Sequence, residues 1–343
     1  MTVFESYKCY FRQRISSLFI LLTVVAATAQ AQFAEIEPQH YFRKTVPAGN
    51  YSGLAWLGGD GSSLLGRNAY IVVNDKPKAD GFDIFTVDIN SGTGEITDVK
   101  KIRSVVSDYH GLRDGEGIAY FPSARTVFIS GEADNRILEY DLQGRLTGRE
   151  LRLPVTLPQG NYGLESLTYN KVTHRFWTTT ESTLPQDGQQ ANAVNGVRNR
   201  LRLMSFDDSL RYRGYLDYIM EGPISTKNAT LYAMGVSALC ALDNGKLLVL
   251  EREAWVPKAK IGAWVVNSVY SVDTRDTSRP VAKHIVAMWR TSMNLVHKDF
   301  ANYEGMCLGP KLADGRQVIV LCADSQNQSG KLLRDWFRTI VIN

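Results

Sequence analysis

Three glutamates recur in the chain, each at the start of a short apolar run and each followed by glycine or serine. They are Glu116 in Gly-Glu-Gly-Ile-Ala-Tyr, Glu165 in Leu-Glu-Ser-Leu-Thr-Tyr and Glu304 in Tyr-Glu-Gly-Met-Cys-Leu. Two further copies, which begin at Tyr51 and Gly235, keep the small residue and the apolar run but lack the glutamate. Carboxylates repeated in this way can hold a hard cation or contact a substrate if the fold brings them together.

A second set of acids closes the β-rich run that follows each motif. These acids are Asp75, Glu132, Glu181, Glu251 and Asp324. If they meet the three glutamates, the crowded charges need a cation, basic side chains or protonation to offset them. Oxygen ligands without His or Cys favour Ca²⁺ over a transition metal, so all eight acids are candidate Ca²⁺ ligands. The alternative is structural, because such a glutamate can also accept hydrogen bonds from loop amides and join neighbouring sheets.

The loop at residues 108–114 leads into the first glutamate motif and would overhang the same site. His110 is a candidate proton carrier and Arg113 a candidate anion clamp. An ordinary solvated loop is the alternative for both residues. The predicted catalytic residues are Glu116, Glu165, Glu304, His110 and Arg113.

The five motifs recur at intervals of about 50 to 70 residues, and several short β runs follow each one, which is typical of a radial β array. Turns rich in Gly, Asn and Asp separate the runs. A long connection after residue 250 carries Trp255 and Trp264, which could stack on a ligand or form a hydrophobic plug. The predicted strands are residues 52–57, 69–73, 83–88, 96–106, 117–121, 126–130, 136–141, 146–153, 165–169, 175–180, 202–207, 212–218, 236–241, 246–250, 267–273, 281–288, 305–308, 317–321 and 339–342.

These strands predict an all-β fold, a β-propeller of five four-stranded blades, with six blades as the alternative. The last blade lacks an obvious fourth strand, and residues 41–46 near the N-terminus can fill that place and close the ring. In a propeller the first strand of each blade lines the axis and the second runs antiparallel beside it. The start of the first strand and the end of the second therefore emerge on one face, which is where the two sets of acids would converge.

Composition sets limits on the partners. The chain has 343 residues, 44% of them hydrophobic, and a formal net charge of +4. Three basic residues and one acidic residue lie in the first 31 positions, which leaves 36 basic and 34 acidic residues for the rest. Because that balance is nearly neutral and shows no block of Lys or Arg, nucleic acid is not expected as a partner. We expect a small-molecule substrate and a monomer.

The first 31 residues have the pattern of an export signal. Lys8, Arg12 and Arg14 precede an apolar run at residues 15–27, and small residues suited to cleavage follow at Ala29 and Ala31. The alternative is a membrane anchor, but the run is shorter than the ~20 residues that span a bilayer. We therefore expect a cleaved signal at 1–31, one domain at 32–343, and a secreted or periplasmic protein.

The three cysteines outside that signal allow two interpretations. Cys307 and Cys322 fall on strands expected to be neighbours, so a disulfide between them is one alternative in an oxidising compartment. The other is that both, with Cys240, are small buried hydrophobic residues. Without His partners at metal spacing, zinc is not expected.

Two common functional motifs are absent from the sequence: the nucleophile elbow of serine hydrolases and the glycine-rich phosphate-binding loop. The run from Gly235 to Leu239 lacks the final glycine of a nucleophile elbow, which disfavours a serine hydrolase of the α/β-hydrolase type. The chain also has no glycine-rich phosphate loop ending in Lys-Ser or Lys-Thr.

The motifs Asp-Gly-Glu-Gly-Ile-Ala at 114–119, Leu-Glu-Ser-Leu at 164–167 and Asn-Tyr-Glu-Gly-Met at 302–306 resemble an extracytoplasmic propeller family. That family is named for the esterase-like activity of phytase. The resemblance implies acidic residues that act in phosphoester hydrolysis, with metal assistance, and Glu116, Glu165 and Glu304 match the family pattern. The copies that begin at Tyr51 and Gly235 lack the acid and so depart from the family pattern.

The sequence is consistent with three alternative functions. The first is a Ca²⁺-assisted phosphoester hydrolase that acts on a small phosphorylated substrate. The second is a non-catalytic propeller that binds a ligand or a protein on the same face. The third is a calcium-dependent lactonase, similar to other calcium propellers.

Overall fold

The computed structural model describes residues 34–58, 66–75, 79–111, 113–157, 163–293, 299–328 and 333–343. The predicted signal at 1–31 lies outside these residues. Residues 34–343 belong to one compact unit. Nowhere in the described ranges is there a helix with the length and hydropathy of a membrane span.

Five antiparallel sheets make up this unit, and four of them have four strands each in sequential order. The first sheet contains β3 (Tyr51–Trp56), β4 (Ala69–Asn74), β5 (Gly81–Ile89) and β6 (Ile96–Val106). The second contains β7 (Gly115–Phe121), β8 (Thr126–Gly131), β9 (Arg136–Asp141) and β10 (Leu146–Leu151). The third contains β11 (Leu164–Asn170), β12 (Arg175–Thr180), β13 (Arg200–Asp207) and β14 (Tyr212–Ile219). The fourth contains β15 (Leu231–Ala241), β16 (Lys246–Val256), β17 (Ala263–Asp273) and β18 (Lys283–Met293).

The fifth sheet joins the two ends of the described chain. It contains β19 (Asn302–Lys311), β20 (Gln317–Asp324) and β21 (Trp336–Ile342), and both β1 (Glu35–Ile36) and β2 (His40–Tyr41) pair with β21. Ring closure by the N- and C-terminal strands is confirmed. The predicted extent of the N-terminal strand, 41–46, is wrong, because residues 43–45 form a turn in which the N–H groups of Thr45 and Val46 donate to the Phe42 carbonyl.

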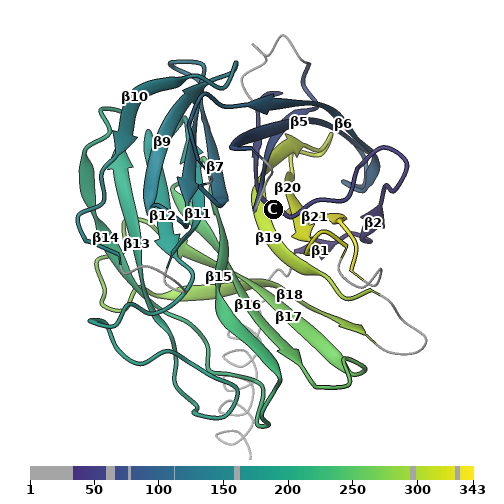
Figure 1. The fold of residues 1–343 in the computed structure, drawn as a ribbon, viewed down its shortest axis with the longest axis vertical. Coiled ribbons are helices and arrows are strands. Elements are labelled where there is room, and N and C mark those ends of the chain that lie inside the picture. Colours follow the sequence, from purple (N-terminus) through teal and green to yellow (C-terminus); the bar gives the residue numbers. More distant parts are fainter. Residues whose placement is uncertain are drawn as a thin grey trace, which may run out of the picture. The chain divides into compact units, whose positions relative to one another are not determined.

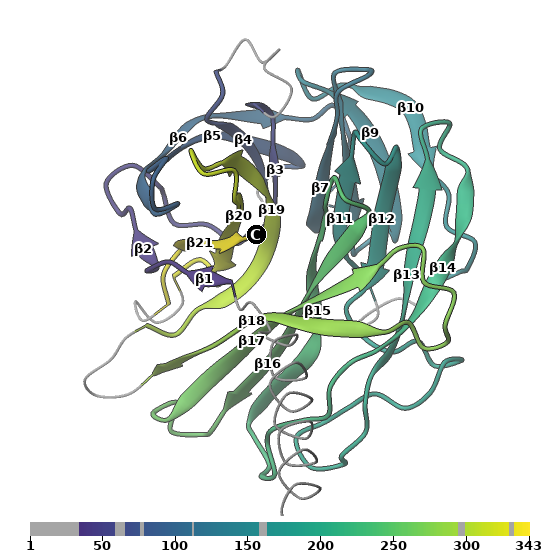
Figure 2. The same cartoon turned by 180° about the vertical axis from the view of Figure 1, so that it is seen from behind.

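The five sheets form a closed cycle, in which each innermost strand contacts the next: β3, β7, β11, β15, β19 and again β3. Figures 1 and 2 show β7, β11, β15 and β19 facing the centre of this cycle. Five hydrophobic clusters fill the spaces between sheets, and each combines side chains from two neighbouring sheets. The five-bladed propeller predicted from the repeated motif is confirmed.

Glycine in the repeated motif lets neighbouring inner strands approach closely. A Cβ added to Gly117 would lie 2.3 Å from the backbone nitrogen of Leu167, and one added to Gly53 would lie 2.4 Å from the Glu116 carbonyl oxygen. These obstacles are backbone atoms of the adjacent blade, so they cannot rotate away. Glycine at these positions therefore serves the packing of blades around the axis.

We expect Gly117→Ala to lower the free energy of unfolding by about 1–3 kcal/mol, because overpacking forces neighbouring backbone apart. Urea unfolding measures the effect. Gly222→Ala is the matched control, since the nearest side-chain atom to an added Cβ there is 3.9 Å away and ordinary contact results. If the two variants are equally stable, the close approach of the inner strands is not a constraint.

The fourth blade differs from its prediction. β16 and β17 continue as one long hairpin through the region read as an insert, and Trp255 and Trp264 face each other across the two strands. Their rings stack with centroids 6.1 Å apart and planes 15° apart. The predicted connection is therefore a sheet extension, stabilised by a cross-strand aromatic pair.

Cys240, Cys307 and Cys322 are buried free thiols. The alternative of a disulfide between Cys307 and Cys322 is wrong, although the two residues do lie on neighbouring strands, β19 and β20. Burial raises the pKa of each thiol, which is consistent with small hydrophobic residues in a packed interior.

Candidate functional site

Each inner strand carries a β-bulge at the position that the sequence motif marks. In the second blade Gly115 pairs with Gly131 and Gly117 pairs with Ser130, so Glu116 between them has no partner on β8. The same register shift occurs in all five blades. The bulged residues are Ser52, Glu116, Glu165, Ser237 and Glu304. A bulge redirects a side chain and interrupts the ladder, so this feature explains why the motif recurs.

The second strand of each blade supplies another ring. In each blade, the residue just before the bulge pairs with a residue of the second strand. The next residue along that second strand occupies an equivalent place in every blade. These residues are Asp75, Glu132, Glu181, Arg252 and Asp324. The structure therefore places four of the five predicted acids in this ring, together with one arginine.

Glu251 is the predicted acid that the structure does not bring to the ring. It pairs directly with Val236, one residue before the ring position, and successive residues of a strand point to opposite faces. Its carboxylate accepts hydrogen bonds from the Tyr218 hydroxyl at 2.6 Å and from Lys283 Nζ at 2.6 Å. The prediction of Glu251 as a metal ligand beside the other acids was one residue out of register.

The three glutamates of the inner strands line one narrow axial passage. Glu116, Glu165 and Glu304 are 6%, 8% and 9% exposed. The free volume among them is about 10 Å³, which is roughly the room that one water needs. The sequence predicted that these acids converge on one face of the propeller, and the structure buries the three side chains in a narrow, closely packed passage.

Burial and crowding disfavour the ionised forms of these carboxyls. Burial, followed by the charges of Glu165 and Glu304, raises the pKa of Glu116 well above its usual value. Burial, followed by Glu181 and Glu304, does the same to the pKa of Glu165. For Glu304, burial and then Asp324 raise the pKa to about 8, against the opposing effect of Arg252.

Arg252 is the main counter-charge of this group. It is 5% exposed, and its guanidinium donates to Glu304 at 2.5 Å, to Asn302 at 2.9 Å and to Glu181. Burial acts to lower the pKa of Arg252, but the acids around it raise that pKa above the ordinary value, so the side chain stays charged. One arginine of the fourth blade thereby ties together acids of the third and fifth blades.

Among the described residues, Asp75, Asp114 and Glu116 form a close group of acids. Each offers one carboxylate oxygen such that the three atoms lie within 4.8 Å of one another. Asp114 has a left-handed backbone with φ of 55°, which is uncommon outside glycine. The backbone N–H of Glu132 donates to the Asp114 carbonyl at 2.9 Å and holds this turn against the end of β8.

Sequence reasoning did not select Asp114 as a ligand. The available signal was its place two residues before the bulged glutamate, in Asp-Gly-Glu. The three carboxylates suit a hard divalent cation, for which Asp and Glu oxygens are the preferred ligands. The acidic group therefore fits a Ca²⁺ or Mg²⁺ ion chemically, with Glu116 shared between this group and the axial passage.

Asp324 closes the ring on the fifth blade. Its carboxylate accepts a hydrogen bond from the Gln326 backbone at 2.7 Å. Burial raises the pKa of Asp324 to about 6, although the hydrogen bonds from Gln326 lower it, and the charge of Asp75 raises it further. Asp324 and Asp75 are thus close enough to influence each other across the first and fifth blades.

The two loop candidates have different environments. Arg113 is fully buried, and it donates to the Asp134 carboxylate at 2.8 Å and to the Arg136 carbonyl at 2.6 Å. Its donors face protein acceptors, so Arg113 stabilises the base of the loop. These contacts give no support to the predicted role as an anion clamp. His110 is exposed on the same loop.

A cavity of about 410 Å³ borders the acidic group at Asp75. Its polar lining includes Asn50, Asn74, Lys101 and Ser104. Lys101 forms an ion pair with Asp83 at 2.8 Å, and its ammonium has three N–H donors in all. The cavity has the size of a small-molecule site and reaches one of the three clustered carboxylates.

Comparison with known proteins identifies the family. Residues 46–326 match the family model described as Phytase-like, esterase-like activity of phytase. A comparison with curated proteins gives no match.

Solved structures with a similar fold have low sequence identity. An endo-arabinase from Bacteroides thetaiotaomicron VPI-5482 is 12% identical, covering 87% of this chain and 96% of that chain with a TM-score of 0.46. An α-L-arabinofuranosidase from Fusarium graminearum is 10% identical, covering 90% and 97% with a TM-score of 0.43. A chain of a nidogen/laminin complex is 12% identical, covering 84% of each chain with a TM-score of 0.40.

The family match includes all three glutamate motifs and residues from each of the five sheets. It confirms the resemblance inferred from those motifs. This chain belongs to the phytase-like family, the esterase-like activity of phytase group.

Proposed function

We propose that this protein is a metal-assisted phosphoester hydrolase. It would act at the end of the propeller where Asp75, Asp114 and Glu116 meet, which we call the acidic end. The observation that carries the proposal is the group of Asp75, Asp114 and Glu116, whose oxygens lie within 4.8 Å of one another. A cavity large enough for a small substrate meets this group at Asp75. The name of the family supports the same class of reaction.

The proposed roles follow from position. Asp75, Asp114 and Glu116 would hold Ca²⁺, which supplies a Lewis acid that polarises a phosphoryl oxygen. Lys101 borders the cavity and can donate hydrogen bonds to a phosphate oxygen. Because the axial passage has room for about one water, a substrate would approach through the cavity and not along the axis.

An activity assay tests the proposal. Purified protein is incubated with phytate, a simple phosphomonoester and a phosphodiester, each with Ca²⁺ or with a chelator. We expect phosphate release that needs Ca²⁺ and that falls by about 10- to 100-fold or more in Asp114→Asn, since even outer partners of metal ligands have effects of that size. Asp314→Asn, in an exposed turn where Asp314 pairs with Arg316, is the control and should retain activity.

Absence of phosphate release from every substrate in both conditions would contradict the proposal. Hydrolysis of a lactone panel, with no phosphate release, would instead favour the calcium-dependent lactonase.

A non-catalytic binding propeller is the second candidate, and the contacts of Arg252 favour it. Because Arg252 bridges Glu181 and Glu304, these two acids have a structural explanation that needs no reaction. A ligand that raises the melting temperature without being turned over would support this candidate. Loss of that stabilisation in Glu304→Gln would place the ligand at the acidic end.

We also infer an extracytoplasmic location, a small-molecule substrate and a monomeric state. The basic and apolar segments of residues 1–31 support export. Mass spectrometry of the protein recovered from the periplasm or the medium checks this inference, with a mature N-terminus expected after Ala29 or Ala31. An intact N-terminus on exported protein would favour the membrane anchor.

A further inference from the structure

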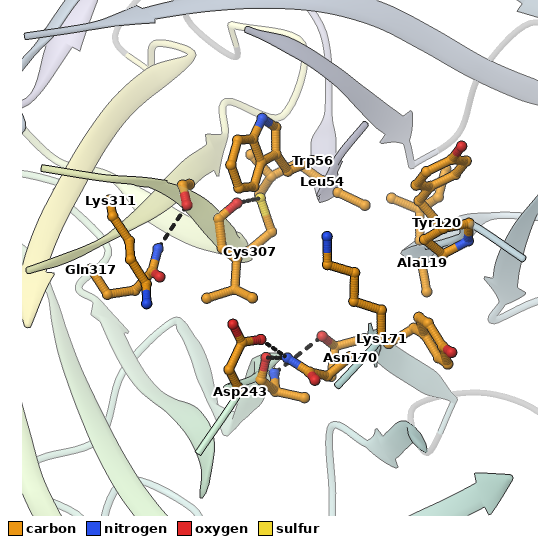
Figure 3. A pocket seen from close by; sticks show the side chains of 18 residues that line it. Leu54, Trp56, Ala119, Tyr120, Asn170, Lys171, Asp243, Cys307, Lys311 and Gln317 are labelled. Atoms are coloured by element: carbon orange, nitrogen blue, oxygen red, sulfur yellow. Dashed lines mark hydrogen bonds between the residues drawn. The ribbon is translucent and has the colours of Figure 1, made fainter. Parts of the chain in front are cut away.

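A second cavity lies at the other end of the inner strands. The bulged glutamates stand near the beginning of these strands, whereas this cavity is lined by residues near their ends, including Trp56 of β3, Tyr120 of β7, Asn170 of β11 and Lys311 of β19. Its volume is about 280 Å³. Figure 3 shows these side chains arranged around the cavity.

The interior of this cavity is mainly apolar. Its floor consists of short and aliphatic side chains: Leu54, Ala55, Ile118, Ala119, Cys307 and Leu308. Aromatic rings provide the walls, and they are held in place. The Trp56 ring stacks on Tyr70 with centroids 6.4 Å apart, and its Nε1 donates to the Arg67 carbonyl at 2.7 Å. A rigid apolar pocket with aromatic walls suits a flat hydrophobic ligand.

Among the described residues that line the cavity, lysines outnumber carboxylates. Lys171 and Lys311 line it, and Asp243 is its one carboxylate among the described lining residues. Asp243 accepts a hydrogen bond from Asn170 Nδ2 at 2.8 Å. In Figure 3 the ammonium of Lys171 extends into the cavity between the side of Trp56 and that of Tyr120, while Lys311 lies beside Gln317.

The turn that carries Lys171 is fixed by its neighbour. Asn170 Oδ1 accepts hydrogen bonds from the backbone of Val172 at 2.9 Å and of Thr173 at 3.0 Å. The Asn170 amide also donates to the Ala241 carbonyl at 3.1 Å, which links the third and fourth blades. The base of the lysine is thus positioned by the fold, which lowers the entropy lost when a ligand binds.

We propose that this cavity binds a small aromatic carboxylate. The ring would lie against the apolar floor and the aromatic walls, and the carboxylate would pair with Lys171 at the rim. Two lysines beside an aspartate provide too little positive charge for a polyphosphate, and the apolar floor suits a ring better than a sugar. The site is separate from the acidic end, so the proposal does not depend on hydrolytic activity.

Ligand-detected NMR with benzoate tests the proposal, and calorimetry gives the dissociation constant. Benzamide, benzylamine and acetate serve as probes that change the charge or remove the ring. We expect benzoate to bind about tenfold or more tightly than benzamide, the difference that one charge-assisted hydrogen bond supplies. We also expect it to bind about tenfold or more tightly than acetate, because acetate keeps the carboxylate but has no ring to bury. We expect benzylamine to bind most weakly of the three aromatic probes.

Variants of one lysine locate the binding. Lys171→Met should weaken benzoate binding about tenfold, Lys171→Arg should retain it, and the exposed Lys227→Met is the control. A chelator and Asp114→Asn should have no effect on benzoate binding. The outcome is therefore independent of whether the proposed metal-assisted hydrolysis is found. The proposal is overturned if benzoate shows no binding at millimolar concentration, if benzamide binds equally well, or if Lys171→Met binds benzoate as the unchanged protein does.

Discussion

Replacement of Arg252 by methionine is expected to lower the free energy of unfolding by about 3–5 kcal/mol, the usual cost of leaving a buried charge without its partner. The guanidinium donates hydrogen bonds to Glu181, Glu304 and Asn302. Without Arg252, the acids on the inner strands and at the ends of the second strands lose the positive charge that the fourth blade supplies. They must then take up protons or repel one another.

Two further variants make the Arg252 result specific. Arg275→Met removes an exposed arginine that pairs with Asp273, and such surface pairs contribute little to stability. The double variant with Arg252→Met and Glu304→Gln should recover part of the lost stability, because it removes one of the uncompensated acids. Denaturant unfolding measures all of these. If Arg252→Met proves as stable as Arg275→Met, Arg252 is not the charge that holds the rings together.

The metal-free protein is expected to lose stability as the pH rises from about 5 to about 8. Burial and neighbouring acids raise the pKa of Asp324 to about 6 and that of Glu304 to about 8. A carboxyl with a raised folded-state pKa binds more protons in the native state than in the unfolded state. Its contribution is complete below the unfolded pKa and is lost as the pH passes the folded one.

Melting curves at a series of pH values, in a chelating buffer, measure this loss. Glu304→Gln should flatten the dependence between pH 6 and pH 8. Asp314→Asn is the control, because hydrogen bonds from Arg316 lower the pKa of Asp314 and its contribution changes only at acidic pH. A native protein whose melting temperature rises between pH 6 and pH 8 would mean that the buried acids are ionised and well compensated.

The number of blades could be predicted because one local pattern repeats. An inner strand needs small residues where it meets the next blade, as Gly117 does against Leu167, and that need appears in the sequence as a recurring motif. Closure by both termini could also be inferred, since an open sheet edge is unfavourable. The precise extent of the N-terminal strands depended on the turn after Phe42, which no periodic pattern marks.

The composition of the second ring could not be predicted as well, because it depends on register. In the fourth blade two charged residues, Glu251 and Arg252, are adjacent, and a shift of one residue exchanges which of them faces the ring. The bulge at Ser237 and the continuation of β16 to Val256 decide that register. Neither feature is visible without the partner strand.

Asp114 was overlooked for a related reason. It lies outside the regular strands, in a turn that a left-handed backbone and a hydrogen bond from the Glu132 backbone shape. The approach of Asp75 across from the first blade completes the group. Proximity of this kind arises between blades, whereas sequence patterns mainly report structure within one strand or hairpin.

The central claim is that the acidic end holds one divalent cation between Asp75, Asp114 and Glu116. Isothermal titration of Ca²⁺ into chelator-treated protein at neutral pH tests it directly, beside Asp114→Asn and the control Asp314→Asn. We expect one site for each chain and loss of that site only in Asp114→Asn. We also expect proton release on binding, because burial and Glu165 keep the pKa of Glu116 high. Absence of binding, or equal binding by all three proteins, would contradict it.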